Sequence, residues 1–249
     1  MSLRAHEVFK QVDTVAGYTT YLDLIQPLIA GKETISTAMQ KEVERVEAAL
    51  DAALAGKACA IVSSGDSGIY AMAGLVLEIC QIKNIAIVPP SGAIPVDCPQ
   101  PVLPIEVVPG IPALCAGAAL LGAPLTHDFA VVSLSDLLTP WEVIEKRIQA
   151  AAQADFVIVI YNPKSKKRNW QLEAAQKIAL EHRDGKTPVG IVTSAMREKQ
   201  SVQIVSLADL HRAPVNMQTI VFIGNSTSAA YRDYMITPRG YTKKYDIDD

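Results

Sequence analysis

The chain has 249 residues, of which 49% are hydrophobic and 20% are charged, and its formal net charge at pH 7 is -3. This composition is typical of a globular protein and excludes a disordered chain, and the length allows one large domain or two of ordinary size. The slightly acidic balance argues against nucleic acid as a partner, because nucleic-acid-binding domains usually carry a strongly basic face. No apolar run approaches the roughly 20 residues of a membrane helix and no signal-peptide pattern is visible, so we expect a cytoplasmic protein that does not bind a membrane.

The first half of the chain alternates between helical and strand patterns, which predicts a mostly parallel sheet in an α/β layer. The expected elements are a helix over residues 3–11, a strand over 12–16, helices over 18–29 and 37–54, a strand over 58–62, a helix over 70–80 and a strand over 85–88.

A small polar turn, residues 63–70, follows the apolar strand at 58–62 and precedes the helix pattern at 70–80. In this geometry backbone N–H groups at a helix N-terminus face a ligand. Asp66 and Ser67 are good helix caps, and the glycines at 65 and 68 let a ligand approach the main chain closely. On pattern alone, an ordinary capped βα turn and a ligand-binding turn are both possible.

Residues 89–112 contain eight prolines, which exclude a helix from most of this stretch. A short strand is expected at 105–108, followed by a helix of small residues at 112–121. The composition changes here, so we predict two domains, residues 1–107 and 108–249.

The second half again alternates, with a sheet that is either parallel or mixed. The expected elements are a strand over 129–134, a helix over 140–152, a strand over 156–161, a basic loop over 164–168, a helix over 170–182, and strands over 189–193, 202–205 and 219–223. Thr139 is an N-cap candidate ahead of Pro140. The tail from Tyr231 onward is polar and aperiodic, and no element is predicted for it.

Candidate catalytic side chains are few. The four histidines lie far apart without HxH or HExxH spacing, and the four cysteines lack CxxC spacing, so we predict no metal site and expect buried, reduced thiols. His127 and Asp128 form either an acid/base pair or a turn before a strand. No nucleophile elbow, P-loop or GxGxxG fingerprint is present. The remaining possibility is a reaction in which a cofactor carries the chemistry and the protein supplies positioning.

Four turns marked by glycine, proline or small residues lie at predicted strand ends: residues 64–70, 109–113, 161–163 and 194–196. The carboxyl ends of strands form the ligand crevice of α/β sheets, so together these turns predict a cleft lined by backbone amides. The basic loop could neutralise an anionic substrate, or it could be a solvated loop without a partner.

Several of these stretches resemble motifs of one family, the tetrapyrrole (corrin and sirohaem) methyltransferases. Residues 63–70, SSGDSGIY, resemble the GDPxxY-type motif, with Ser67 where the family usually has Pro or Ala, and residues 106–113, EVVPGIPA, resemble the second, PG-containing motif. The stretches THDFA at 126–130, SLSDLLTPWE at 133–142, YNPKS at 161–165 and ITPRGY at 236–241 resemble the precorrin-3B or cobalt-precorrin-3 C17-methyltransferase branch.

The resemblance implies two α/β domains with S-adenosylmethionine in the cleft between them, usually in a homodimer. The cofactor residues it implies are Gly65, Asp66, Ser67, Tyr70, Ile111, Pro112, Ala113, Tyr161, Asn162, Ala195, Met196, Thr219 and Ile220. An anionic tetrapyrrole would meet the basic loop through Lys164, Lys166, Lys167 and Arg168. No catalytic residue is predicted.

The implied activity is methyl transfer to C17 of precorrin-3B or cobalt-precorrin-3 in cobalamin biosynthesis, with or without ring contraction, and S-adenosylhomocysteine as the second product. Family members open with a strand and a GxGPG loop ahead of the helix expected at 3–11, and the sequence contains neither. Two alternatives therefore remain: a truncated, inactive binding remnant, and a corrin methyltransferase that acts at another ring carbon. A nicotinamide enzyme would need the absent GxGxxG.

Overall fold

The structure, a computed structural model, describes residues 1–93, 95 and 97–245. Its internal contacts divide the chain into two compact units, Met1–Pro112 and Ala113–Asp249. The division falls at the end of the proline-rich stretch, whereas the boundary predicted from the sequence lies between residues 107 and 108, and that domain assignment stays a proposal.

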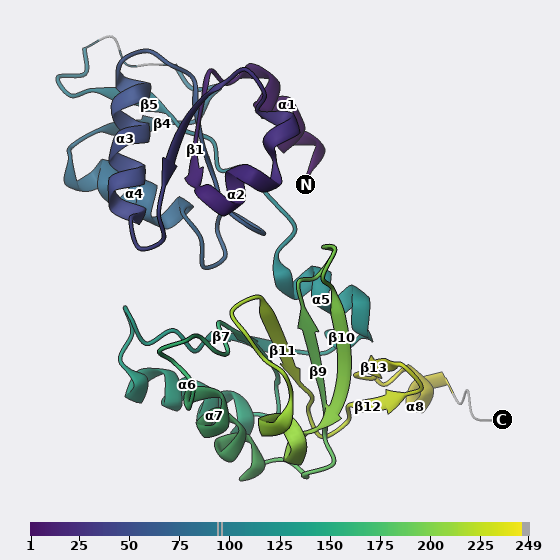
Figure 1. Ribbon diagram of the computed structural model, residues 1–249. Coiled ribbons are helices and arrows are strands. Elements are labelled where there is room, and N and C mark those ends of the chain that lie inside the picture. The colour runs from purple at the N-terminus through teal and green to yellow at the C-terminus, as the bar shows by residue number, and fades with distance from the viewer. Residues whose placement is uncertain (94, 96, 246–249) are drawn as a thin grey trace. The chain divides into compact units, whose positions relative to one another are not determined.

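The first unit consists of short strands between helices (Figure 1). Its elements are α1 (Leu3–Gln11), β1 (Thr14–Tyr18), α2 (Thr19–Leu24), the 3-10 helix η1 (Gln26–Leu28), β2 (Glu33–Thr37), α3 (Glu42–Leu54), β3 (Cys59–Val62), α4 (Ala73–Ile82), β4 (Ala86–Val88) and β5 (Val102–Pro104). A parallel sheet has the order β2-β1-β3, and β4 pairs in parallel with β5.

Alternating side chains of β3 cover both faces of the first sheet, as the period of two in a strand requires. Ala60 and Val62 contact a cluster that includes Phe9 of α1 and Leu22 of α2. Ile61 contacts the other cluster, which α3 and α4 supply. The predicted α/β layer with a parallel sheet is therefore confirmed in this unit.

Several expected elements of the first unit differ from the structure. Residues 18–29 form α2 and then η1, with Pro27 in the first turn of η1, because proline lacks the N–H that would continue an α-helix. The helix predicted from residue 37 begins at Glu42, since β2, which was not predicted, ends at Thr37. The strand predicted at 105–108 is wrong: β5 ends at Pro104, opposite Val88, where its partner β4 also ends.

The second unit is built on a five-stranded mixed sheet. Its elements are α5 (Ala113–Leu121), β6 (Gly122–Ala123), β7 (Phe129–Ser133), α6 (Trp141–Gln153), β8 (Val157–Tyr161), α7 (Gln171–Leu180), β9 (Pro188–Thr193), β10 (Ser201–Ser206), the 3-10 helix η2 (Leu207–Arg212), β11 (Thr219–Ile223), β12 (Ala229–Tyr231), β13 (Tyr234–Ile236) and α8 (Tyr241–Tyr245). The strand order is β10-β9-β11-β8-β7, in which β11 is antiparallel to both β8 and β9.

Helices cover both faces of this sheet. Ile158 and Ile160 of β8 belong to a cluster with buried residues of α6, α7 and η2, while Val159 belongs to a second cluster with Leu121 of α5. α5 lies close to the strands because Gly117 faces Phe222, where an added Cβ would be 2.8 Å from the ring. The buried strands that the apolar runs predicted thus lie between two hydrophobic clusters.

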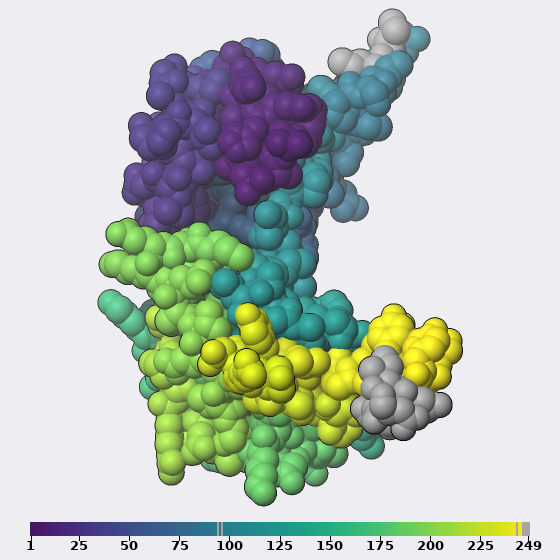
Figure 2. All heavy atoms as spheres, turned by 90° about the vertical axis from the view of Figure 1, so that its right-hand side faces the viewer, coloured from purple at the N-terminus to yellow at the C-terminus, as the bar shows by residue number. Residues whose placement is uncertain are grey.

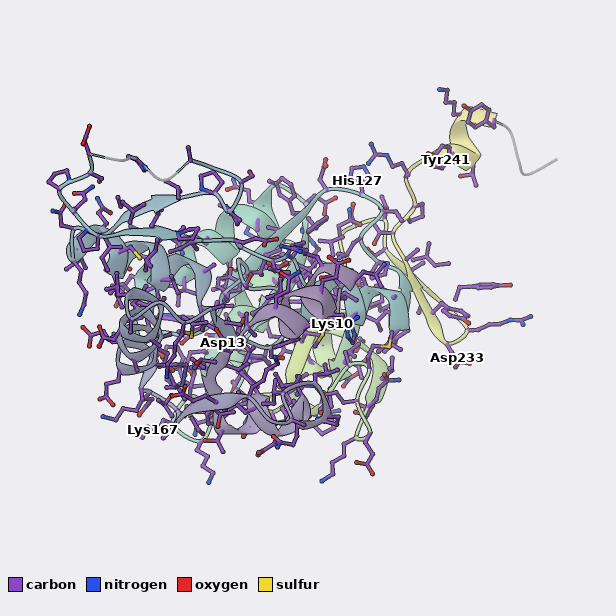
Figure 3. The ribbon with its side chains drawn as sticks, turned by 90° about the horizontal axis from the view of Figure 1, so that it is seen from above. Lys10, Asp13, His127, Lys167, Asp233 and Tyr241 are labelled. Carbon is purple, nitrogen blue, oxygen red and sulfur yellow. The ribbon has the colours of Figure 1, made fainter. Side chains whose placement is uncertain are left out.

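β12 and β13 form a hairpin, most of which lies in the stretch from Tyr231 onward for which the sequence predicts no element. β13 pairs in parallel with β6, so the hairpin extends a three-stranded sheet of its own. Figure 2 shows this yellow segment on the surface of the second unit, and Figure 3 shows Asp233 at the tip of the hairpin. The register with β6 is a contact between distant parts of the chain, which local periodicity does not reveal.

Within the described residues, no helix is long and apolar enough to cross a membrane. Among the same residues, no group of three or more His, Cys, Asp or Glu side chains could hold a metal ion. The four cysteines are free, but only Cys80 is buried, and Cys115 is exposed, contrary to the expectation of buried thiols.

Candidate functional site

In the first unit, two of the predicted motifs lie in direct contact. The Asp66 carboxylate accepts hydrogen bonds from the backbone N–H groups of Gly68 and Gly110, each at 2.8 Å. The Ser67 hydroxyl donates to the carbonyl of Val108 at 3.0 Å. A Cβ at residue 110 would be 2.0 Å from the carbonyl oxygen of Gly65, so only glycine fits there. The 63–70 turn and the 108–110 segment therefore form one structure.

The turn does not run straight into a helix. α4 begins at Ala73 after Met72, so the prediction that Asp66 or Ser67 caps this helix is wrong. Tyr70 has a positive φ of 51°, which is incompatible with the helix start expected there. Because the carboxylate of Asp66 is used within the loop, a ligand here would meet chiefly main-chain groups, and Gly65 is exposed with a φ of 83°.

Helix α1 holds the second motif from the other side. The Ser2 hydroxyl donates to the carbonyl of Pro109 at 2.8 Å. Arg4 donates two hydrogen bonds to Glu106, at 2.7 and 2.6 Å, in a bidentate pair. The hydrogen bond from Arg4 lowers the pKa of Glu106 below its usual value. These contacts fix the approach to Ile111, which is exposed, and to Pro112, the last residue of the unit.

In the second unit, the predicted cofactor residues converge at one edge of the five-stranded sheet. Strands β8 and β9 both end there, and the antiparallel strand β11 between them begins there, with Thr219 opposite Thr193. The edge thus carries residues from three strand ends that are far apart in the sequence: Tyr161, Asn162, Ala195, Met196, Thr219 and Ile220. The seventh predicted residue of this unit, Ala113, is the first residue of α5.

The backbone at this edge bends sharply. Asn162 after β8, and Ser194 and Met196 after β9, have positive φ values of 51°, 51° and 58°. Non-glycine residues in the left-handed region are uncommon, and such conformations cluster at binding sites. The bends change the direction of the main chain just beyond the strand ends.

Several side chains of the predicted set are already engaged. The Tyr161 hydroxyl accepts a hydrogen bond from the backbone N–H of Leu114 at 3.0 Å, and the hydroxyls of Thr219 and Thr193 are 2.8 Å apart. Ile220 is only 3% exposed and belongs to the cluster under α5. These residues can meet a ligand chiefly through the main chain, whereas the side chain of Met196 is 65% exposed.

The basic loop follows the same edge, but its four predicted substrate contacts are not equivalent. Lys164, Lys166 and Lys167 are exposed, whereas Arg168 is only 7% exposed. The Nε of Arg168 donates to the carbonyl of Asn162 at 3.2 Å. The expectation that Arg168 contacts substrate like the lysines is therefore corrected: its guanidinium is directed into the protein and supports the Asn162 bend.

Sequence reasoning missed the loop after β7 as part of this edge. The Ser133 hydroxyl accepts hydrogen bonds from the Asn162 side-chain amide at 2.9 Å and from the Ser135 backbone at 3.2 Å. Asp136 accepts from the side-chain amide of Gln171 at 2.8 Å. The strand, helix and strand expected over 129–161 were the signal that could have found these residues, because this pattern predicts parallel pairing, and parallel strands end at the same edge.

His127 and Asp128 lie at the opposite edge, before β7. The Nδ1 atom of His127 accepts the backbone N–H of Asp128 at 2.8 Å, so this is a turn histidine rather than an acid/base pair of the edge described above. Both residues line a cavity of about 530 Å³ together with Asp155, Asn225 and Arg239. Figure 3 shows His127 on the same side as Tyr241 of the tail.

Comparison with known proteins gives the family. The family model described as Tetrapyrrole (Corrin/Porphyrin) Methylases matches residues 1–211. The chain belongs to this family. Tetrapyrrole methylases take their methyl group from S-adenosylmethionine, so the predicted enzyme class and cofactor are confirmed.

Individual tetrapyrrole methylases are similar to this chain over most of its length. A cobalt-factor III methyltransferase of Priestia megaterium is 46% identical over 245 residues, which make up 98% of this chain and 43% of that protein. A probable cobalt-factor III C(17)-methyltransferase of Salmonella typhimurium is 43% identical over 242 residues, or 97% of this chain and 94% of that protein. The crystal structure of the methyltransferase CobJ matches with a TM-score of 0.82 and 29% identity over 96% of this chain and 93% of that chain, which confirms the predicted fold.

The residues present fit the cofactor of a tetrapyrrole methylase. S-adenosylmethionine carries an amino acid and an adenosine, both rich in groups that main-chain N–H and C=O groups recognise. The first unit offers the exposed main chain around Gly65, and the second offers the main-chain bends at Asn162 and Met196. When bound, the cofactor supplies an electrophilic methyl group.

Proposed function

We propose that this tetrapyrrole methylase methylates C17 of cobalt-factor III or of the closely related precorrin-3B and cobalt-precorrin-3, as a step of cobalamin biosynthesis. The observation that carries the proposal is the similarity to the Salmonella relative, which extends over 97% of this chain and 94% of that protein. The SLSDLLTPWE and YNPKS stretches support it, because they form the loops after β7 and β8 at the edge described above.

The structure supports a mechanism in which the protein mainly aligns the reactants. Neither group of predicted cofactor residues includes a histidine or a cysteine, and their side chains are small, apolar or engaged in the fold. An electron-rich ring carbon can attack a sulfonium methyl group without an enzyme nucleophile. Orientation of the two reactants can contribute up to roughly 7–11 kcal/mol. The cofactor residues of the two units therefore act by holding and orienting.

A methylation assay tests the proposed function. The protein is incubated without oxygen with cobalt-factor III and S-adenosylmethionine that carries a ¹³C-methyl group, and the product is examined by mass spectrometry and NMR. A labelled methyl group on C17 is expected, and the NMR spectrum also reports whether the ring has contracted. Methylation at another ring carbon would contradict the proposed position and favour the alternative corrin methyltransferase.

Calorimetry, together with the methylation assay, distinguishes the proposed enzyme from the second candidate, a binding protein without turnover. Saturable binding of S-adenosylhomocysteine without product would favour it. Restoring activity by adding a strand and a GxGPG loop ahead of Met1 would then reject it. No binding of S-adenosylhomocysteine by the folded chain would contradict the cofactor residues proposed here.

The lysines of the basic loop bind the carboxylate arms of the tetrapyrrole. Lys164, Lys166 and Lys167 are exposed within a stretch of four residues, so they can face several acidic arms at once. Replacing all three by glutamine is expected to raise KM for the tetrapyrrole at least tenfold and to leave the affinity for S-adenosylhomocysteine unchanged. Lys177→Gln, a change on the exposed face of α7, is the control.

The active form is a homodimer, which family resemblance suggests and the β12–β13 hairpin supports. β12 has a neighbour on only one side among the described strands, and Tyr231 and Tyr234 are 60% and 54% exposed. Exposed edge strands with aromatic side chains are common association surfaces. Light scattering after gel filtration should give twice the chain mass, and a double change of these tyrosines to serine should give the monomer. The cytoplasmic location stays a prediction.

A further inference from the structure

The three exposed lysines lie on a short segment that two hydrogen bonds hold in place. We call residues 164–167 the lysine loop. The Ser165 backbone N–H donates to the carbonyl of Arg168 at 2.8 Å, and the Arg168 backbone N–H donates back to the Ser165 hydroxyl at 3.0 Å. These two bonds close the loop on Arg168, so a ligand that orders the lysines also acts on this residue.

The side chain of Arg168 connects the loop to the Asn162 bend. Arg168 is 7% exposed, and its Nε donates to the carbonyl of Asn162 at 3.2 Å. Burial lowers the pKa of Arg168, and the negative charge of Asp136 raises it. Asp136 is itself held by Gln171, which is only 2% exposed. The guanidinium therefore contacts the Asn162 main chain, and the Asp136 carboxylate is near enough to act on it electrostatically.

The Asn162 bend is held at its other side by β7. Asn162 has a φ of 51°, and its side-chain amide donates to the Ser133 hydroxyl at 2.9 Å. The backbone N–H of Leu134 donates to the carbonyl of Tyr161 at 3.0 Å. With these bonds in place, the hydrogen bond from the Arg168 side chain helps to set the position of the Asn162 carbonyl.

We propose that Arg168 is a positioning residue that couples the lysine loop to the Asn162 bend, so that a tetrapyrrole bound to the lysines and a cofactor bound at the bend strengthen each other's binding. This inference rests on the proposed function, which assigns the two ligands to these two segments. A tetrapyrrole that orders the lysine loop also restrains Arg168, and Arg168 in turn restrains the Asn162 bend. The cofactor then binds a bend that is already ordered. The effect is reciprocal, because a coupling free energy acts equally in both directions.

The test is a pair of calorimetric titrations with S-adenosylhomocysteine on the full chain. One is done alone and one with saturating uroporphyrin III, a tetrapyrrole that carries acetate and propionate arms. The ratio of the two dissociation constants is the coupling factor. The wild-type chain is expected to bind S-adenosylhomocysteine at least about fivefold more tightly when the tetrapyrrole is present.

Arg168→Gln is expected to reduce the coupling factor to nearly one while both ligands still bind. Arg168→Lys keeps the charge but has no planar guanidinium, so it is expected to give an intermediate coupling factor. Asp136→Asn removes the negative charge that acts on Arg168 and should also lower the factor, which keeps the test valid if Arg168→Gln does not fold. Arg147→Gln, on the exposed face of α6, is the control and should keep the wild-type factor.

A purely structural role of Arg168 would lower the unfolding temperature of its variants without changing the coupling factor, and this result would overturn the inference. A wild-type factor of one with both ligands bound would overturn it as well, while the proposed function would stand. If the wild-type chain binds no S-adenosylhomocysteine under either condition, the proposed function fails, and the inference fails with it.

Discussion

Asp66 shows how a single side chain can hold two distant segments together. Its two carboxylate oxygens accept one backbone N–H from its own turn and one from Gly110. In Asp66→Asn one oxygen becomes an NH₂ group, which faces a donor. Losing one charge-assisted hydrogen bond should cost about 1.5–3 kcal/mol in the free energy of unfolding.

Urea unfolding measures this loss, and calorimetry should reveal at least about tenfold weaker binding of S-adenosylhomocysteine. The control is Asp23→Asn on the exposed face of α2, which should stay within about 0.5 kcal/mol of wild type. If Asp66→Asn unfolds at the wild-type urea concentration, the cross-link between the motifs contributes no stability.

Gly110 is the second residue that the motif contact requires. In Gly110→Ala the new methyl group would lie 2.0 Å from the carbonyl oxygen of Gly65, so the two segments must separate. We expect a loss of about 1–3 kcal/mol in stability and weaker cofactor binding. Gly74→Ala is a matched control in α4, because nothing lies within 4 Å of its added Cβ. That change should be neutral or stabilise by up to about 1 kcal/mol.

The cysteines should differ in their reaction with iodoacetamide. Burial raises the pKa of Cys59 to about 11, with a smaller contribution from the charge of Glu33. Since only the thiolate reacts, roughly one Cys59 in a thousand is reactive at pH 8, and the fraction rises with pH up to that pKa. Cys115 is exposed and should react first. Peptide mass spectrometry follows each site, and equal rates at Cys59 and Cys115 in the folded protein would contradict the expectation.

At the scale of elements, the fit of α5 on the second sheet depends on a small residue. Gly117→Ala would place a methyl group 2.8 Å from Cε2 of Phe222, inside a core in which that ring is fully buried. Although alanine favours a helix, the overlap should give a net loss of about 1–3 kcal/mol.

A double-mutant cycle isolates this contact. Phe222→Leu makes room for the methyl group, so the double variant should lose less stability than the sum of the two single changes. Additive losses in urea unfolding would mean that α5 shifts freely over the sheet.

At the scale of the whole molecule, each unit has its own hydrophobic clusters: among the described residues there are two in the first unit and two in the second. A fragment of residues 113–249 should therefore fold alone and unfold cooperatively in urea, as followed by circular dichroism. A fragment of residues 122–249 lacks α5 but keeps β6, and it uncovers Phe222 and Val159, so it should lose several kcal/mol of stability. Equal stability of the two fragments would contradict the role of α5.

The sequence by itself determined much of the fold and the motifs from which the candidate site residues are proposed. Buried strands such as β8 and β11 are continuous apolar runs, and the motifs around Asp66 and Tyr161 are short, local and specific. Local signals of this kind are readable because the side chains that generate them are neighbours in the chain. Family membership, cofactor and enzyme class followed from them.

Only the tertiary structure decided how those residues are used. The bond between Asp66 and Gly110, the pairing of β13 with β6, and the insertion of β11 between β8 and β9 join positions far apart in the chain. Arg168 reads in the sequence as one of four basic loop residues, yet the strand ends around it bury its guanidinium against Asn162. Burial and partners are set by contacts between distant segments, and no local pattern records them.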